Sequence, residues 1–266
     1  MTEGRPSIPL KSISLPAEHG GWGFLFEPLL LGLLLAATSA GGWISLGALG
    51  AFLARHPLKL ILNDVLRGRG SPRLRPALAF VAGYGVLALL GFGLAYRAGA
   101  ARSFLPLLAA FPLALLQLHY DARNRGRNLV PEMVGALAPG ALASAVLMAG
   151  GWALGPALVP WLLLALKAAT SILYVRARLR LDRGGAADRG VVWISHGAAI
   201  ALAAAFAAAG RGPWLAAVAF AALALRSGFG LSALRKPIRP QRLGFQEVGY
   251  GLLTVLLLAT GYRFDL

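Results

Sequence analysis

Long apolar runs alternate with short polar breaks along almost the whole chain. Several runs reach or exceed about 18 residues with few charges, the length that crosses about 30 Å of hydrocarbon. The breaks are rich in Gly, Pro and Arg, as in "RGRGSPRLRP" and "DARNRGRN". This pattern predicts an all-α polytopic membrane protein. We expect about nine spans, at 22–40, 43–62, 76–96, 103–120, 131–150, 153–174, 191–209, 213–231 and 246–262.

These spans predict a single transmembrane helical domain over residues 22–262. Residues 1–21 are expected to form a cytoplasmic N-terminal segment, and residues 263–266 a short tail. The first fifteen residues are polar and lack the apolar centre of a cleavable signal peptide. We therefore expect the first span to act as the targeting signal.

Composition supports the membrane assignment. Hydrophobic residues make up 58% of the 266 positions, and the mean hydropathy is +0.68, whereas soluble domains are roughly 45–50% apolar. There is no cysteine, which excludes disulfides and thiolate metal sites. The net charge of +16 is typical of basic loops that face the cytoplasm and anionic phospholipids, so no nucleic-acid partner is predicted.

The distribution of Lys and Arg tests the nine-span topology. With nine spans, 22 of the 26 basic residues fall at the end of the molecule that holds the N-terminus. Such a bias places the N-terminus in the cytoplasm and the C-terminus outside. All four histidines and nine of the ten acids lie in the same half. We therefore predict a site that opens toward the cytoplasm.

Ionisable residues inside the spans are the candidates for this site, because each is costly in lipid unless it faces a cavity or a partner. In the second span, Arg55, Lys59 and Asn63 share one helical stripe, with His56 at its edge. Arg55 lies about two turns deeper than Asn63, roughly 12 Å. Arg55 could reach the water at the membrane surface only in a strained conformation, so we expect its side chain to face the interior of the bundle.

Other spans add polar groups at the same depth. The sixth span has a stripe of Lys167, Thr170, Ser171, Tyr174 and Arg178. The acids expected to pair with Arg55 are Glu18, Glu27 and Glu132. The candidate substrate-binding residues are Glu18, His19, Glu27, Arg55, His56, Lys59, Asn63, Asp64, Arg67, Tyr120, Arg123, Glu132, Lys167, Tyr174, Arg178 and Asp182. No two histidines are three or four residues apart, so no histidine metal site is expected.

The segments "LPAEHGGWGFLFEPLLLGLL", "RHPLKL" and "YVRARLRL" resemble the YwiC-like family of bacterial membrane proteins. The likeness extends nearly end to end. It implies a fold and a place in the bacterial cytoplasmic (inner) membrane, rather than a reaction.

The layout is also similar, more loosely, to the UbiA superfamily of intramembrane prenyltransferases. That resemblance implies nine helices and two aspartate-rich motifs, after helices 2 and 6, which hold a polyprenyl diphosphate through two magnesium ions. Here "NDVLRGRGS" resembles the first motif and "YVRARLRLDRGGAADRG" the second. The segment "HYDARNRGRNLVPEMVGALA", which contains Tyr120, is similar to the Tyr-basic motif after helix 4.

The acidic motifs depart from the UbiA pattern. Asn63 and Asp64 match, but Arg67 and Ser71 stand where the next two aspartates belong. Asp182 can match the last acid of the second motif. One aspartate in each basic loop makes a poor two-magnesium site, so no cofactor is predicted, and Asp64 and Asp182 are the residues that a magnesium ion would use. Arginine binds phosphate or carboxylate directly.

Three functions remain open at this stage. The first is a UbiA-like bundle that binds an anionic-headed isoprenoid or lipid at an Arg-rich cavity, with or without a divergent prenyl transfer. The second is an assembly or structural protein whose arginines face phospholipids and partner proteins. The third is a small-anion transporter, for which the apolar outer half offers little to build a gate.

Overall fold

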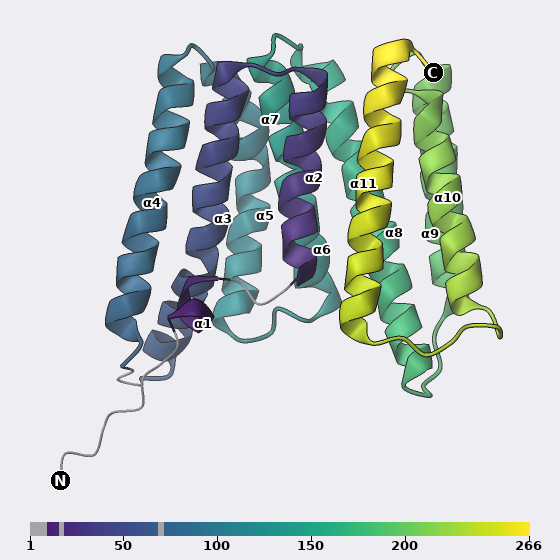
Figure 1. Ribbon diagram of the computed structural model, residues 1–266, viewed down its shortest axis with the longest axis horizontal. Helices are drawn as coiled ribbons and strands as arrows, with labels where there is room; N and C mark the ends of the chain where they lie inside the picture. The colour runs from purple at the N-terminus through teal and green to yellow at the C-terminus, as the bar shows by residue number, and fades with distance from the viewer. Residues whose placement is uncertain (1–9, 16–18, 69–71) are drawn as a thin grey trace.

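The computed structural model describes residues 10–15, 19–68 and 72–266, and every regular element in them is helical. The elements are α1 (Lys11–Ser14), α2 (His19–Leu35), α3 (Ser39–Leu66), α4 (Leu74–Arg97), η1 (Ala101–Phe104), α5 (Leu105–Ala122), α6 (Leu129–Leu137), η2 (Ala138–Gly140), α7 (Ala141–Ala149), α8 (Leu154–Asp182), α9 (Arg189–Ala208), α10 (Trp214–Leu231) and α11 (Pro240–Phe264). The long helices run roughly antiparallel and form one bundle (Figure 1).

The helices lie where the spans were predicted. Seven helical segments of the described chain are long and apolar enough to cross a membrane: α4, η1 with α5, α6 to α7, α8, α9, α10 and α11. The helix α2 has 17 residues, and α3 carries Arg55 and Lys59 within its 28 residues. The membrane-type bundle is thus confirmed, while the count of nine spans and the direction of insertion stay predictions.

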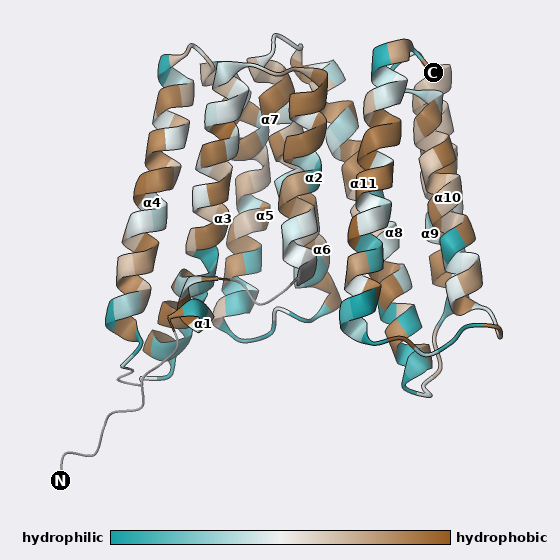
Figure 2. Ribbon diagram, viewed as in Figure 1, coloured by the Kyte–Doolittle hydropathy of each residue, from teal (hydrophilic) through white to brown (hydrophobic). Residues whose placement is uncertain are grey.

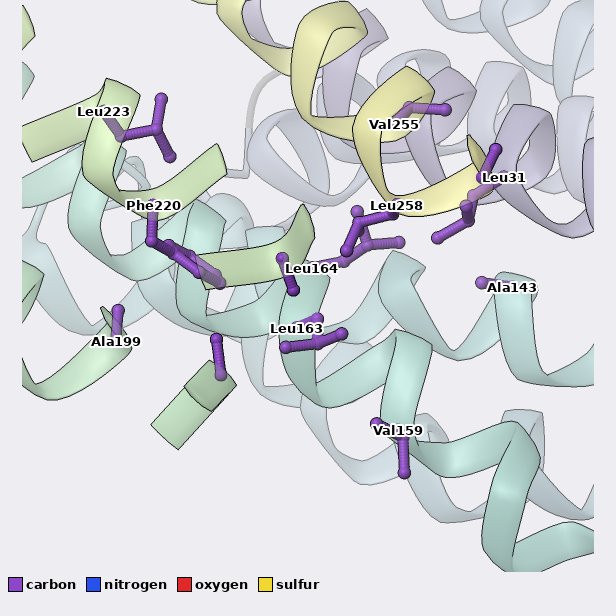
Figure 3. Close-up of a cluster of buried hydrophobic side chains, with 13 residues drawn as sticks. Leu31, Ala143, Val159, Leu163, Leu164, Ala199, Phe220, Leu223, Val255 and Leu258 are labelled. Carbon is purple, nitrogen blue, oxygen red and sulfur yellow. The ribbon is translucent and has the colours of Figure 1, made fainter. Parts of the chain in front are cut away.

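Hydrophilic residues gather at one end of the bundle (Figure 2). This end, which we call the basic end, holds the start of α2 and the α3–α4, α5–α6, α8–α9 and α10–α11 connections. The C-terminus lies at the opposite end (Figure 1). The largest apolar core, drawn in Figure 3, joins α2, α7, α8, α9, α10 and α11. Its α8 members, Val159, Leu163 and Leu164, precede the polar stripe, so this core lies farther from the basic end than the ion pairs do.

Glycines let α3 and α4 approach closely. A Cβ on Gly91 would collide with the backbone of Gly47, and one on Gly50 with the backbone of α4 at Tyr84 and Ala88. Small residues are the usual means of such contact between membrane helices. The hairpin of α3 and α4 therefore forms a rigid edge of the bundle.

The fifth predicted span is broken at Pro139, within η2. Proline has no N–H, so the carbonyl of Gly135, four residues earlier, loses its helical donor. Trp161 of α8 donates its indole N–H to the carbonyl of Leu137 at 2.9 Å. The break therefore separates α6, which reaches the basic end, from α7, which is almost wholly buried.

Candidate functional site

A cavity of about 340 Å³ lies among six helices. Polar side chains enter it from α2, α3, α5, α6, α8 and α11, namely Glu27, Arg55, Gln117, Glu132, Lys167, Ser171, Arg176 and Glu247. Its volume is within the range of about 300–1,000 Å³ that is usual for small-molecule sites. The structure therefore brings together four of the candidate residues, Glu27, Arg55, Glu132 and Lys167.

An ion pair between Lys167 and Glu27 lies in the cavity wall. The Lys167 ammonium donates to Oε1 of Glu27 at 2.6 Å, and the two side chains are 3% and 11% exposed. Helix α11 passes so close that a Cβ on Gly251 would collide with the Glu27 carboxylate. The pair thus joins α8 to α2, and it needs a glycine on α11.

Arg55 pairs with an acid that was not among its expected partners. Its Nη2 and Nε donate to Oδ2 of the buried Asp121 on α5, at 2.7 and 3.0 Å. Lys59 lies 3.6 Å from the other carboxylate oxygen, and the amide of Asn63 donates to the backbone carbonyl of Asp121 at 3.1 Å. The stripe on α3 therefore faces inward as predicted, but it docks on the end of α5 and not on Glu27 or Glu132.

A third ion pair links α6 to α8 at the cavity wall. Nη1 of Arg176 donates to Oε2 of Glu132 at 2.6 Å and to the backbone carbonyl of Arg127 at 3.1 Å. Both side chains of the pair are about one-third exposed, at 38% and 34%. This pair is the most accessible of those that line the cavity.

Two buried polar atoms in the cavity lining have no hydrogen-bond partner in the part of the chain that the structure describes. They are Oε1 of Gln117 and Oγ of Ser171, whose residues are 7% and 5% exposed. Buried polar atoms are nearly always satisfied by protein, water or ligand. The cavity wall thus contains an acceptor and a hydroxyl that no described residue satisfies.

Behind the cavity, Arg226 of α10 is enclosed by aromatic and acidic groups. Its Nη1 donates to both carboxylate oxygens of Glu247, at 2.7 and 2.5 Å. Its guanidinium carbon lies 4.1 Å from the ring centre of Tyr174 and 5.2 Å from that of Tyr250. The candidate Tyr174 therefore packs on an arginine rather than lining the cavity.

The loop candidates are engaged elsewhere. Asp64 accepts from Nη2 and Nε of Arg73 at 2.7 and 2.9 Å, and this hydrogen bonding raises the pKa of Arg73. Asp182 accepts from Nε of Arg178 at 3.0 Å, and the other guanidinium nitrogens of Arg178 donate to the carbonyls of Gly230 and Lys236. Asp64 and Asp182 are therefore each bound to an arginine side chain.

The remaining candidates whose side chains the structure describes lie outside the cavity lining. The ring of His56 is 3.1 Å from the carbonyl of Ser12. Arg67 and Arg123 line a separate hollow at the basic end, and Tyr120 contacts the ring of His119. Glu18 and the side chain of His19 lie outside the described residues.

Neither aspartate of the UbiA-like motifs has the surroundings of a magnesium ligand. Asp64 and Asp182 each face guanidinium groups, and no group of three His, Asp or Glu among the described residues could hold a metal ion. Magnesium requires carboxylate oxygens that are free to coordinate it. The residues present do not fit the two-magnesium site that the superfamily resemblance implies.

The cavity is less basic than expected. Its lining holds three acids (Glu27, Glu132 and Glu247) and three bases (Arg55, Lys167 and Arg176), so this cavity is not Arg-rich. Asp121, Gln117 and Arg176 were not among the candidate residues. Gln117 and Asp121 are four residues apart on α5, a spacing that signals a shared polar face.

Comparison with known proteins gives one family. Residues 15–149 match the model described as YwiC-like protein, which covers half of the chain. No curated protein and no solved structure gave a match. The matched part supplies α2 to α7, and α8 and α11 complete the cavity.

Proposed function

The chain belongs to the YwiC-like family, and from this premise we propose that it binds a lipid-like molecule, such as an isoprenoid, with a small anionic head. The head would occupy the cavity among α2, α3, α5, α6, α8 and α11. The UbiA-like bundle with nine spans, an N-terminus in the cytoplasm and a place in the bacterial inner membrane is part of this proposal. In that orientation the cavity opens toward the cytoplasm.

The observation that carries the proposal is the pair of unsatisfied polar atoms. Oε1 of Gln117 and Oγ of Ser171 belong to residues that line the cavity, and no described residue bonds to either. Leaving a buried polar group unpaired costs about 1–3 kcal/mol. A head group that donates to Gln117 and exchanges a hydrogen bond with Ser171 would remove that cost.

Charge selects the head group. The ion pairs around the cavity contain five bases, Arg55, Lys59, Lys167, Arg176 and Arg226, and four acids, Glu27, Asp121, Glu132 and Glu247. The excess of one positive charge suits a singly charged carboxylate or phosphodiester better than a diphosphate. Arg55 keeps Nη1 without a hydrogen bond to any described residue, so it can donate to such a head.

Apolar walls suit the tail. The cavity is also lined by Phe24, Ile172, Val175, Leu179 and Val248. Pockets that bind small molecules combine such walls with a few placed polar groups. A chain of isoprene or methylene units would lie against them while its head meets Arg55 and Ser171.

Divergent prenyl transfer would be a narrower form of this function. It requires assistance to a leaving diphosphate, which magnesium supplies in the superfamily that the chain resembles. Because Asp64 and Asp182 are held by arginines, we propose binding and derive no transfer step.

An assembly or structural role is the second candidate, and one observation favours it. Each basic side chain in the cavity lining already has a carboxylate partner within the protein. Ion pairs of this kind can join helices without taking part in ligand binding. Transport of a small anion has less support, because the apolar core of Figure 3 lies between the ion pairs and the opposite end of the bundle.

Ligand-induced thermal stabilisation of the purified protein tests the proposal. The probes are geranylgeranoic acid, geranylgeranyl phosphate and geranylgeranyl diphosphate, added to protein in detergent. We expect the singly charged acid to raise the unfolding temperature most. Ser171→Ala and Gln117→Leu should weaken its binding about tenfold each, since each removes one buried hydrogen bond.

Ser144→Ala is the matched control. Ser144 is buried on α7 and donates to the carbonyl of Ala157 at 2.7 Å, away from the cavity. This variant should lower stability and leave the ligand-induced shift unchanged. Absence of any shift with all three probes, or an equal shift in Ser171→Ala and the parent protein, would favour the structural role.

A further inference from the structure

A second hollow at the basic end has a different character from the cavity. It lies between α10, α11 and the segment that connects them, and its volume is about 1,000 Å³. Its lining contains five bases, Arg178, Arg226, Arg235, Lys236 and Arg242, and no acid. The cavity of the proposed function has equal numbers of both. We call this second hollow the α10–α11 groove.

Three of the five bases hold the groove together. Arg178 donates to the carbonyls of Gly230 and Lys236, which fixes the connecting segment against α8. Arg226 binds Glu247, and Arg235 donates to the carbonyls of Ser232 and Leu181 at 3.3 Å each. These contacts give the groove a fixed shape.

The other two bases are available to a ligand. Lys236 and Arg242 are exposed, and neither side chain forms a hydrogen bond or ion pair with any residue that the structure describes. Lys236 lies in the connecting segment just before α11, and Arg242 lies in the first turn of α11. Two such cations beside a groove without acids attract an anion.

The apolar part of the groove faces outward from the bundle. Phe229 of α10 and Leu253 of α11 line it and are 74% and 41% exposed. Leu253 lies three turns along α11 from Arg242, farther from the basic end. The groove thus presents cations at the end of the bundle and apolar side chains along its flank.

We propose that the α10–α11 groove binds an anionic phospholipid. The phosphodiester would lie between Lys236 and Arg242, and an acyl chain would extend past Phe229 and Leu253. A soluble phosphate would use the cations alone and leave the apolar flank unused. A zwitterionic lipid would bring its own cation toward Lys236 and Arg242, which have no carboxylate partner among the described residues. The inference does not depend on what the cavity binds.

Native mass spectrometry with added lipid tests this proposal. The full chain, stripped of bound lipid in detergent, is titrated with phosphatidylglycerol, with phosphatidylcholine of the same acyl chains, and with glycerol 1-phosphate. The variant is Lys236→Gln with Arg242→Gln. The control is Arg183→Gln with Arg189→Gln, which removes two exposed charges from the same end but outside the groove.

We expect phosphatidylglycerol to bind the parent protein at least tenfold more tightly than phosphatidylcholine does. The groove variant should bind phosphatidylglycerol about tenfold more weakly, and the control should bind it as the parent does. An equal loss in the control would overturn the site. Equal binding of phosphatidylcholine, or competition by glycerol 1-phosphate at the affinity of the lipid, would overturn the ligand.

Discussion

The ammonium of Lys167 lies 2.6 Å from the carboxylate of Glu27, although 140 positions separate them in the chain. Both side chains are buried within the bundle. Burial makes each charge depend on the other, since an isolated charge is far more costly than a pair. The contact thus fixes α8 against α2 at the cavity.

Lys167→Met should lower the free energy of unfolding by about 3–5 kcal/mol, because it leaves the Glu27 carboxylate buried without its partner. Chemical denaturation in detergent measures this loss. The double variant Lys167→Met with Glu27→Gln leaves no buried charge, and we expect it to regain most of the stability. If the double variant is as unstable as the single one, the two residues are not coupled.

Gly251→Ala should also destabilise the protein. The added methyl would meet the Glu27 carboxylate and the Lys167 ammonium, so α11 must move away from α2. We expect the free energy of unfolding to fall by about 1–3 kcal/mol, as measured by chemical denaturation in detergent. Gly249→Ala is the matched control, because a Cβ at Gly249 has open space around it. A loss of the same size in both variants would refute the close approach at Gly251.

Asp121→Asn should cost more than Arg55→Gln. Asp121 accepts from Arg55 and lies near Lys59, so its neutralisation leaves two cations without a counter-charge. Arg55→Gln leaves Asp121 with Lys59. We expect the free energy of unfolding to fall by about 3 kcal/mol in Asp121→Asn and by about 1 kcal/mol in Arg55→Gln. Thermal unfolding measures both losses. A smaller loss in Asp121→Asn would show that Asp121 does not balance both bases.

Removal of magnesium should change nothing. Asp64 and Asp182 accept from arginine side chains, so EDTA should leave both the unfolding temperature and the ligand-induced shift as they are in magnesium. Differential scanning fluorimetry with and without EDTA measures both. A magnesium-dependent shift that is lost in Asp64→Asn would restore the two-magnesium interpretation of the loop motifs.

The direction of insertion can be tested directly, because the chain has no cysteine of its own. Ala186→Cys lies in the α8–α9 connection at the basic end, and Ala209→Cys lies at the other end of α9. With the basic end in the cytoplasm, an impermeant maleimide added to intact cells should label only Ala209→Cys. The opposite labelling would reverse the predicted orientation.

The sequence predicted the helices well because their apolar runs are set by the hydrocarbon that they must cross. The inward direction of Arg55 could also be predicted, since a helical stripe shows which residues share a face. The identity of its partner could not. A stripe does not say which helix packs against it, and Asp121 meets Arg55 only because the end of α5 lies against α3.

The stripe on α8 shows the same limit. Lys167 and Ser171 line the cavity, whereas Tyr174 and Arg178 line the α10–α11 groove. All four share one face of the helix, but different neighbours cover that face at different depths. Arg178 binds backbone carbonyls of a distant segment, a role that no local pattern in the sequence signals.

Two of the cavity ion pairs cross the boundary of the family match. Residues 15–149 supply Glu27 and Glu132, and the later part of the chain supplies Lys167 and Arg176. A substitution that neutralises one member leaves its partner charged at the junction of the two parts. Positions 27 and 167, and positions 132 and 176, should therefore co-vary among relatives.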